Sequence, residues 1–295
     1  MDFNWLKKLQ VSTKDLSLQP MESKTQATAA TAGESVTFSL PMDMLLYGID
    51  LMCTADTTGA LADKITEVEL KLDGSKTIRN LSGNMLKTIA TMYGKKPSTG
   101  FYPIYIVDAV LDTDPIPLKQ FSSCTLKVTV GAAAAGIKNV ITPTLQLGAR
   151  QSYGKLSDFQ NGSILVETFL PQAVYGANLG DLMYEHMRSQ NVYGYIIETG
   201  DADTLADTTF DQYTLKLFSA NGVLTPFDHV TLAQLKEWNT QENNGNALPT
   251  GVFYIGIPDA LKTRDYTNIK SYFHATVAGT NKQVKVLERA KFGGV

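Results

Sequence analysis

The sequence has few residues that could cross-link the chain or hold a transition metal. Cys53 and Cys124 are the only cysteines and form no C-x-x-C pair, so neither a disulfide framework nor a zinc ribbon is expected. His186, His229 and His274 lie far apart and lack the close spacing that a cupin-type metal site requires. We therefore expect two buried free thiols and no zinc or iron site.

Long apolar runs and an excess of one charge are also missing. No run approaches the roughly 18 apolar residues that span a bilayer, and the N-terminus shows no signal-peptide pattern. The pattern predicts a chain that is soluble when made and is not exported by the usual route. With 26 Lys+Arg against 29 Asp+Glu and a net charge of -3, no basic field is expected to condense on nucleic acid. We predict no sequence-specific nucleic-acid partner.

The motifs of common enzyme classes are not found. No Gly-x-Ser-x-Gly elbow occurs, so the usual serine-hydrolase arrangement lacks its nucleophile. Between Gly148 and Gly154-Lys155 there is one residue too many for a phosphate-binding loop, and Leu156 stands where Ser or Thr would bind magnesium. We predict that the protein is not an enzyme.

Acidic residues gather in two stretches that could form oxygen-rich loops. They are Asp108, Asp112 and Asp114, and Asp201, Asp203, Asp207 and Asp211. Such loops can hold calcium, but Ala206 stands where an EF-hand loop needs glycine. Solvated acidic loops and no cofactor are the favoured interpretation, with a calcium site as the alternative.

What the sequence does contain is a tandem duplication. Residues 38–41 read FSLP and residues 168–171 read TFLP, and each is followed shortly by Tyr-Gly. Residues 100–114 (GFYPIYIVDAVLDTD) and 251–265 (GVFYIGIPDALKTRD) share Gly, an Ile-x-Ile pair, Asp-Ala and the closing Asp without a gap. A repeat of this kind predicts two similar structural units in series.

Alternation of apolar and polar residues predicts strands in both halves. In residues 65–73, Val68, Leu70 and Leu72 share one face, and Asp73-Gly74 then supplies the positive φ of a tight hairpin. Further strands are predicted by alternation or by β-branched and aromatic composition. They lie near residues 36–40, 125–130, 164–169, 192–198, 212–218, 252–257 and 271–277.

One short helix is predicted in each half. The first follows Ser82, a good N-cap residue, and ends before Gly94. The second follows Thr231 and carries Leu232, Leu235 and Trp238 as its apolar positions.

Together these elements predict an all-β fold of two tandem eight-stranded jelly-roll β-sandwiches with a short helix in each, plus an N-terminal amphipathic arm. The predicted domains are the arm at 1–33, a first jelly roll with its linker at 34–148 and a second jelly roll at 149–295. Residues 131–162, which include AAAAG and show little periodicity, are predicted to be a surface linker.

The arm carries the candidate contact residues. Its apolar side chains fall near helical spacing, and its two lysines are placed to meet anionic headgroups. These membrane or subunit contact candidates are Phe3, Trp5, Leu6, Lys7, Lys8 and Leu9. Residues 23–33 are predicted to be a flexible tether that reaches inward from the first sandwich.

The order of these features resembles the double jelly-roll major capsid proteins of lipid-containing icosahedral viruses, closest to the corticovirus type. The resemblance rests on Leu40-Pro41 after the first strand, the strand that runs into Asp73-Gly74, the helix after it, the aromatic strand at 102–107 and the Ala-rich exit after Val130. It is most evident in the first half.

The resemblance implies a homotrimer whose jelly rolls stand upright over an internal viral membrane. Its implied partners are neighbouring trimers and minor capsid and vertex proteins, and its implied location is the virion capsid, with the host cytoplasm before assembly. The alternative function is a carbohydrate- or receptor-binding β-sandwich, such as a lectin or viral spike, because the same fold class serves both.

Overall fold

The computed structural model describes most of the chain. The described residues are 16–28, 32–57, 59–60, 62, 64–96, 98–107, 113–148, 163–169, 173–176, 179–186, 191–201, 204–242, 245, 247–262, 265–276 and 281–293. Its helices are short, and no described helix has the length and apolar character needed to cross a membrane.

The chain divides into two compact units. The first comprises Met1–Ala90, Lys96–Val166 and Phe292–Val295, and the second comprises Thr91–Lys95 and Glu167–Lys291. The predicted division between residues 148 and 149 falls at the edge of residues 149–162, which lie outside the described part. That boundary therefore stays a prediction.

The described part of the first unit contains ten strands, one α-helix and one 3-10 turn. Its strands are β1 (Leu16–Pro20), β2 (Lys24–Thr25), β3 (Glu34–Ser39), β4 (Leu45–Ala55), β5 (Ile65–Leu72), β6 (Lys76–Ser82), β7 (Phe101–Tyr105), β8 (Ile116–Pro117), β9 (Cys124–Val130) and β10 (Asn139–Gly148). Helix α2 (Gly83–Met92) follows β6, and the 3-10 turn (Leu118–Gln120) follows β8.

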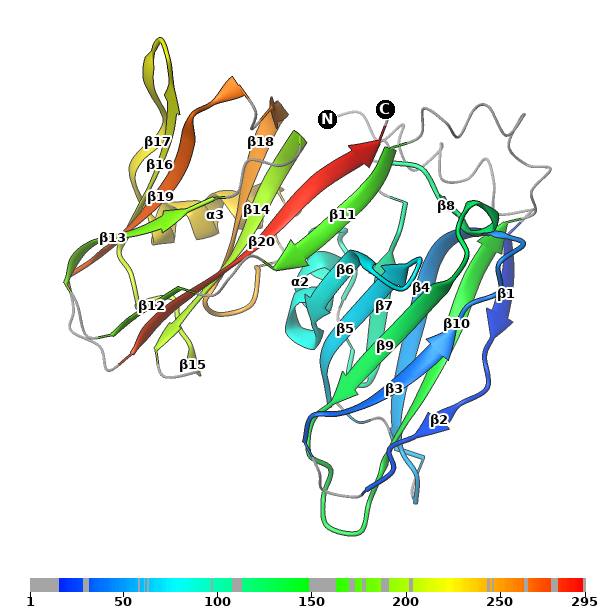
Figure 1. Cartoon of the computed structure of the whole chain (residues 1–295). Helices are drawn as coiled ribbons and strands as arrows, with labels where there is room; N and C mark the ends of the chain where they lie inside the picture. The colour runs from blue at the N-terminus through cyan, green and yellow to red at the C-terminus, as the bar shows by residue number, and fades with distance from the viewer. Residues whose placement is uncertain are drawn as a thin grey trace. The chain divides into compact units, whose positions relative to one another are not determined.

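These strands form two antiparallel sheets (Figure 1). One has the order β1-β10-β4-β7, with β2 added to β10 and β8 to β4, and the other contains β6-β5-β9-β3. Val68, Leu70 and Leu72 of β5 are fully buried, so the predicted face is the core face. The hairpin after β5 has positive φ at Asp73 (51°) and Gly74 (71°), as a turn matching the twist of the two strands requires.

The predicted tether and linker contain strands and are corrected here. Within residues 23–33, Lys24 and Thr25 pair with Ile141 and Val140 of β10, so this stretch is fixed to a sheet. Within residues 131–162, β10 is a long strand that pairs with β4 from Asn139 to Gly148. Its odd-numbered residues from 139 to 147 are buried. This period-2 pattern is hard to see in the sequence, because Asn139 and Pro143 stand at inward positions and Val140 at an outward one.

The second unit repeats this composition. Strand β11 (Ser163–Phe169) is divided between the units. The strands that follow are β12 (Ala173–Gly176), β13 (Gly180–Glu185), β14 (Asn191–Asp201), β15 (Thr204–Leu205), β16 (Gln212–Ser219), β17 (Gly222–Thr231), β18 (Val252–Lys262), β19 (Asn268–Ala275) and β20 (Lys282–Gly293). Helix α3 (Leu232–Glu242) follows β17.

The strand order of the two units is the same. The sequence match of residues 100–114 with 251–265 begins at equivalent strands, β7 and β18, whereas FSLP ends β3 and TFLP ends β11, which are not equivalent in this order. The order β6-β5-β9-β3 in the first unit corresponds to β17-β16-β19-β13 in the second. Likewise β7-β4-β10 corresponds to β18-β14-β20. In both units the helix joins the first of these sheets to the second. The predicted all-β fold of two tandem jelly rolls is thereby confirmed.

Both helices begin at the residues that the sequence indicates. The Met85 N–H donates to Ser82 Oγ at 3.1 Å. Thr231 and Gln234 form a reciprocal capping box, in which the Gln234 N–H donates to Thr231 Oγ1 and the Thr231 N–H to Gln234 Oε1, both at 3.1 Å. The prediction for Trp238 is wrong, because its side chain is 45% exposed and Asn239 is buried instead.

Two glycines at equivalent places show how closely the duplication holds. Gly100 and Gly251 precede β7 and β18, and both have φ of +71°. The Gly100 carbonyl accepts from the Cys53 N–H of β4 at 2.8 Å, and the Gly251 carbonyl accepts from the Thr199 N–H of β14 at 2.7 Å. The left-handed backbone therefore aims a carbonyl at the same strand in each unit, a conformation that glycine adopts without steric cost.

Gly251→Ala tests this constraint. A Cβ at residue 251 would lie 2.5 Å from the Thr199 carbonyl oxygen and 2.7 Å from the Ala206 nitrogen. We expect a loss of about 3 kcal/mol or more in free energy of unfolding, because backbone clash adds to backbone strain. Gly245→Ala is the control, since its φ is +84° but nothing lies within 4 Å, and it should cost only about 1 kcal/mol. Equal losses in denaturant titrations would contradict this account.

Candidate assembly surfaces

The predicted contact residues of the arm cannot be placed. Phe3, Trp5, Leu6, Lys7, Lys8 and Leu9 lie outside the described residues, so their contact with lipid or a neighbouring subunit stays a prediction. Surfaces for assembly must therefore be sought from residue 16 onward.

Exposed apolar side chains are the first indication of such surfaces. The large exposed apolar residues in the described part are Leu18, Leu179, Met183, Val223, Leu224 and Trp238. Leu18 projects from β1, which joins its sheet through β10 alone. The others all belong to the second unit.

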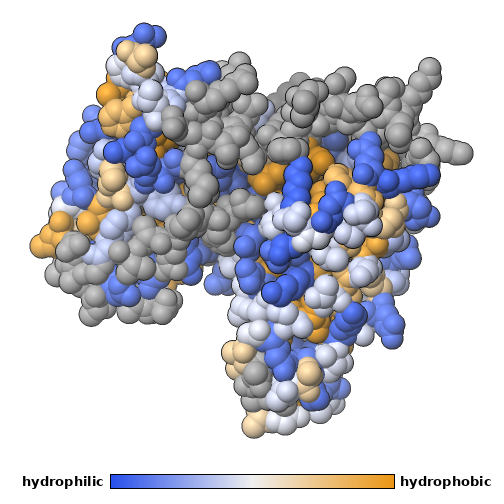
Figure 2. Space-filling view, viewed as in Figure 1, coloured by the Kyte–Doolittle hydropathy of each residue, from blue (hydrophilic) through white to orange (hydrophobic). Residues whose placement is uncertain are grey.

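Four of these residues mark the two edges of one sheet. In the order β13-β19-β16-β17, Met183 lies on β13 with Leu179 just before it, and Val223 and Leu224 begin β17. Val223 and Leu224 are each 56% exposed. Figure 2 shows hydrophobic side chains among polar ones on the face of the β16–β17 hairpin. Edge strands carry unpaired backbone groups, so exposed apolar residues there favour association with another chain.

The hairpin that presents Val223 and Leu224 is fixed by its own turn. Ser219 pairs with Gly222, Ser219 Oγ donates to the Gly222 carbonyl at 3.1 Å, and the Asn221 N–H donates to Ser219 Oγ at 3.3 Å. The sequence indicates this Asn-Gly turn. It does not indicate that the apolar residues after the turn face solvent, because Val-Leu reads like the start of a core strand.

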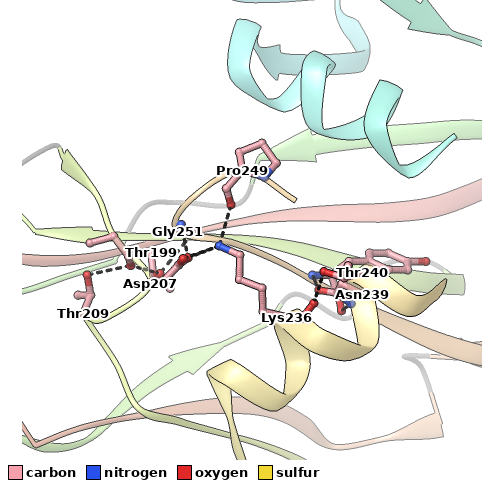
Figure 3. Close-up of polar contacts among 10 residues, drawn as sticks. Thr199, Asp207, Thr209, Lys236, Asn239, Thr240, Pro249 and Gly251 are labelled. Carbon is pink, nitrogen blue, oxygen red and sulfur yellow. Dashed lines mark hydrogen bonds and ion pairs between the residues drawn. The ribbon is translucent and has the colours of Figure 1, made fainter. Parts of the chain in front are cut away.

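Helix α3 covers the free edge of β18. The Asn239 side chain donates from Nδ2 to the Tyr254 carbonyl at 2.8 Å and accepts the Tyr254 N–H at 2.9 Å (Figure 3). The amide thus pairs with β18 as a neighbouring strand would, and the backbone groups of Tyr254 are satisfied. This edge, unlike those of β13 and β17, is protected from pairing with another chain.

An ion pair holds the same helix to the loop before β18. Lys236 Nζ lies 2.5 Å from Asp207 Oδ1 and donates to the Pro249 carbonyl at 3.3 Å. Asp207 Oδ1 also accepts the Gly251 N–H at 2.6 Å (Figure 3). Because Asp207 is 39% exposed, the ion pair itself contributes little, and the carboxylate acts mainly by satisfying the Gly251 N–H.

The acidic residues predicted as loop or calcium candidates take separate roles. Asp207 pairs with Lys236, Asp201 Oδ1 accepts the Asn281 N–H at 2.6 Å, and Asp211 Oδ1 accepts the Thr276 N–H at 3.0 Å. Asp108, Asp112 and Asp203 lie outside the described residues. No group of three or more His, Cys, Asp or Glu side chains suited to a metal ion occurs in the described part.

The three histidines are not brought together. His229 Nδ1 lies 2.7 Å from Asp228 and His274 Nδ1 lies 2.9 Å from Asp181, both at the surface. His186 is buried, with Nε2 2.6 Å from Ser271 Oγ. Ser271 has no exposed surface, so this Ser–His pair cannot meet a substrate as a hydrolase nucleophile would.

Comparison with known proteins gives these surfaces a context. Residues 22–152 match the family model of the viral coat protein P2 N-terminal domain. No curated protein matches the chain at the level of sequence.

Among solved structures, the chain is similar to the major capsid protein P2 of bacteriophage PM2, with a TM-score of 0.67, 14% identity, and coverage of 94% of this chain and 98% of that chain. It is also similar to the STIV major capsid protein (TM-score 0.69, 15% identity, 94% and 96% coverage). A third similar structure is the PBCV-1 virus capsid (TM-score 0.60, 9% identity, 94% coverage of each).

The chain has the double jelly-roll fold of the viral capsid proteins. The predicted resemblance is confirmed, in the first half by the coat-protein domain and over nearly the whole chain by the fold. The matched coat-protein domain also indicates a structural protein and not an enzyme, as the missing motifs predict.

Asp207→Ala tests whether the carboxylate holds the loop before β18. The variant leaves the Gly251 N–H without its acceptor and leaves Lys236 with only the longer hydrogen bond to the Pro249 carbonyl among those described, so we expect a loss of about 1–3 kcal/mol in free energy of unfolding. Asp228→Ala is the matched control, because Asp228 is 65% exposed and pairs only with exposed His229; its effect should stay within about 0.5 kcal/mol. Similar losses in both variants would refute the role given to Asp207.

Proposed function

We propose that the chain is the major capsid protein of a lipid-containing icosahedral virus, and that it works as a homotrimer tiled into a shell over an internal membrane. The observation that carries the proposal is the repeated strand order of the two units, together with the coat-protein match of residues 22–152. Two similar sandwiches in one chain give a trimer a nearly sixfold outline, which suits a hexagonal lattice.

The exposed apolar edges support self-association. A shell subunit needs lateral contacts with other copies, and Met183 on β13 and Leu224 on β17 offer apolar contact at opposite edges of one sheet. The proposed function is structural: the rigid sandwiches set the angles between neighbouring subunits, and many weak contacts between subunits hold the shell together. The proposed partners are neighbouring trimers, minor capsid and vertex proteins, and the chain would reside in the host cytoplasm before assembly.

The arm is proposed to link the shell to the membrane. The head with Phe3, Trp5 and Leu6 and its two lysines would lie on an anionic lipid surface without crossing it. The described chain supports a shorter reach than the sequence suggests, because pairing of β1 and β2 with β10 fixes residues 16–20 and 24–25. Packing of the head in a groove of a neighbouring subunit is the competing role.

Oligomeric state tests the capsid proposal. Light scattering on the purified chain should give the mass of a trimer, because an obligate capsomer buries a large apolar interface. A glycan-binding screen on the same sample serves as the second measurement. A stable monomer at micromolar concentration that binds a sugar would instead favour the lectin or spike function.

Deletion of residues 1–10 tests the role of the arm. The truncated chain should form the same trimer, since the first described strand begins at Leu16, but it should bind anionic vesicles several-fold more weakly than the intact trimer. Replacement of Lys7 and Lys8 by Gln in the full-length chain separates the charge contribution from the apolar one. If the truncated trimer bound vesicles as well as the intact trimer does, the membrane role would be lost and subunit bridging would replace it.

A further inference from the structure

A cluster of polar side chains lies buried inside the second jelly roll. The strands that carry it belong to both sheets of this unit and are labelled in Figure 1. One sheet contributes side chains from β13, β16 and β19, and the other from β14 and β20. The cluster consists of Tyr184, His186, Tyr195, Tyr213, Ser271 and Glu288, all of them at least nine-tenths buried.

Part of this cluster forms a satisfied hydrogen-bond chain. The Tyr213 hydroxyl lies 2.8 Å from Ser271 Oγ, which lies 2.6 Å from His186 Nε2. The chain runs along one sheet and ends at the imidazole. The other imidazole nitrogen, Nδ1, takes no part in this hydrogen-bond chain.

Three buried polar atoms of the cluster are left over. His186 Nδ1, Tyr195 Oη and Glu288 Oε2 are inaccessible to solvent and have no hydrogen-bond partner among the described residues. A buried polar atom without a partner is destabilising, so three in one core would together be a large penalty. Native cores instead satisfy such atoms with ordered water.

The three residues that carry these atoms adjoin one another. Tyr195 and Glu288 are direct cross-strand partners in the β14–β20 ladder, which brings their Cβ atoms within about 6 Å. Glu288 has the same parity as Val284, Val286 and Ala290, which all belong to the core, so it faces inward. The His186 and Tyr195 rings lie 4.3 Å apart between centroids.

We propose that His186 Nδ1, Tyr195 Oη and Glu288 Oε2 enclose a buried binding site for ordered water, faced by Glu288 as a neutral carboxylic acid. A water molecule can donate to and accept from the three groups at once, and buried waters make about three hydrogen bonds. A neutral acid also contributes a donor, whereas a carboxylate would place an uncompensated charge in the core. The occupant is water and not a metal ion, because one imidazole and one carboxyl are too few ligands, and no metal-binding group of three or more His, Cys, Asp or Glu side chains occurs among the described residues.

The electrostatics of the cluster agree with this assignment. Burial raises the pKa of Glu288 to about 7 and lowers the pKa of His186 to about 3. The titratable groups of the described part whose pKa values Glu288 affects are Tyr195 on β14 and Tyr184 on β13, and burial raises the pKa values of both. Below pH 7, Glu288 therefore holds its proton, while His186 is neutral.

The two groups give opposite pH dependences. Glu288 keeps its proton in the folded state from its ordinary value of 4.5 up to about 7, so its contribution to stability is present at low pH and is lost as the pH rises through this range. His186 stays neutral in the folded state below its ordinary value of 6.5, so its contribution falls as the pH drops below 6.5. Between 4.5 and 6.5 the two slopes cancel.

Glu288→Gln in the full-length protein removes the pH dependence of stability that comes from Glu288 and leaves the opposite dependence that comes from His186. Its stability should rise with pH between 4.5 and 6.5, where that of the wild type gains nothing from this pair. Relative to the wild type, its unfolding equilibrium constant should fall on the order of a hundredfold from pH 4.5 to pH 7. Glu185→Gln, on the exposed side of β13, should run parallel to the wild type. If the free energy of unfolding of Glu288→Gln and of the wild type varied with pH in parallel, the assignment of Glu288 as a neutral acid would be overturned.

Two measurements on the wild type keep the proposal testable if the variant does not fold. Infrared spectra at pH 6, where exposed carboxyl groups are ionised, should retain a protonated carboxylic acid C=O band that disappears above pH 8. A carboxylate at pH 6 would place the proton on His186 and refute the assignment. A high-resolution crystal structure should show water within about 3 Å of the three atoms; a dry core in which they bond to each other, or a metal ion in their midst, would refute the water site.

Discussion

Both units depend on the burial of every second residue of their strands between facing sheets. The Leu-Lys-Leu sequence occurs at the same place in each unit: Leu70 and Leu72 of β5, and Leu215 and Leu217 of β16, are buried, while the lysine between them is partly exposed. A one-residue slip would exchange the leucines and the lysine, so the core specifies the register. The strand order and the position of each helix follow from that register, and the repeated surfaces follow in turn.

Charged side chains that are buried in these cores form hydrogen bonds or ion pairs. Arg289 Nε donates to Glu167 Oε1 at 2.7 Å, with both side chains nearly inaccessible. Arg79, which is fully buried, donates to the backbone carbonyls of Ile78, Leu165 and Tyr105. Buried charged groups of this kind add little net stability. They disfavour alternative packings, because any packing that separates the partners leaves a buried charge uncompensated. The water site proposed at Glu288 extends this pattern.

The sequence predicts the strands in which apolar and polar residues alternate, and it predicts where both helices begin. The strands around Val68, Leu126 and Leu215 and both helix starts are found where the apolar pattern and the N-cap residues indicate. The strand β10 is missed because Asn139 and Pro143 occupy inward positions and Val140 an outer one, which breaks the alternation of apolar and polar residues. Asn139 Nδ2 donates to Gln26 Oε1 at 3.0 Å, a pairing that no local pattern reveals.

The candidate surfaces are harder to predict because exposure is decided by sheet order. Val223 and Leu224 look like core residues in the sequence, and only the edge position of β17 exposes them. Likewise β20 contains buried Lys282, Glu288 and Arg289, whose burial depends on partners from distant strands. Their charged side chains predict exposed positions, whereas contacts with residues distant in the sequence place them in the interior.

Electron cryo-microscopy of virus particles that contain this chain will show whether it builds an icosahedral shell. We expect a shell whose capsomers are trimers with paired upright jelly rolls into which both units fit, above a lipid bilayer. A shell made of another protein, with this chain found only on vertex spikes, would rule out its role as the major capsid protein.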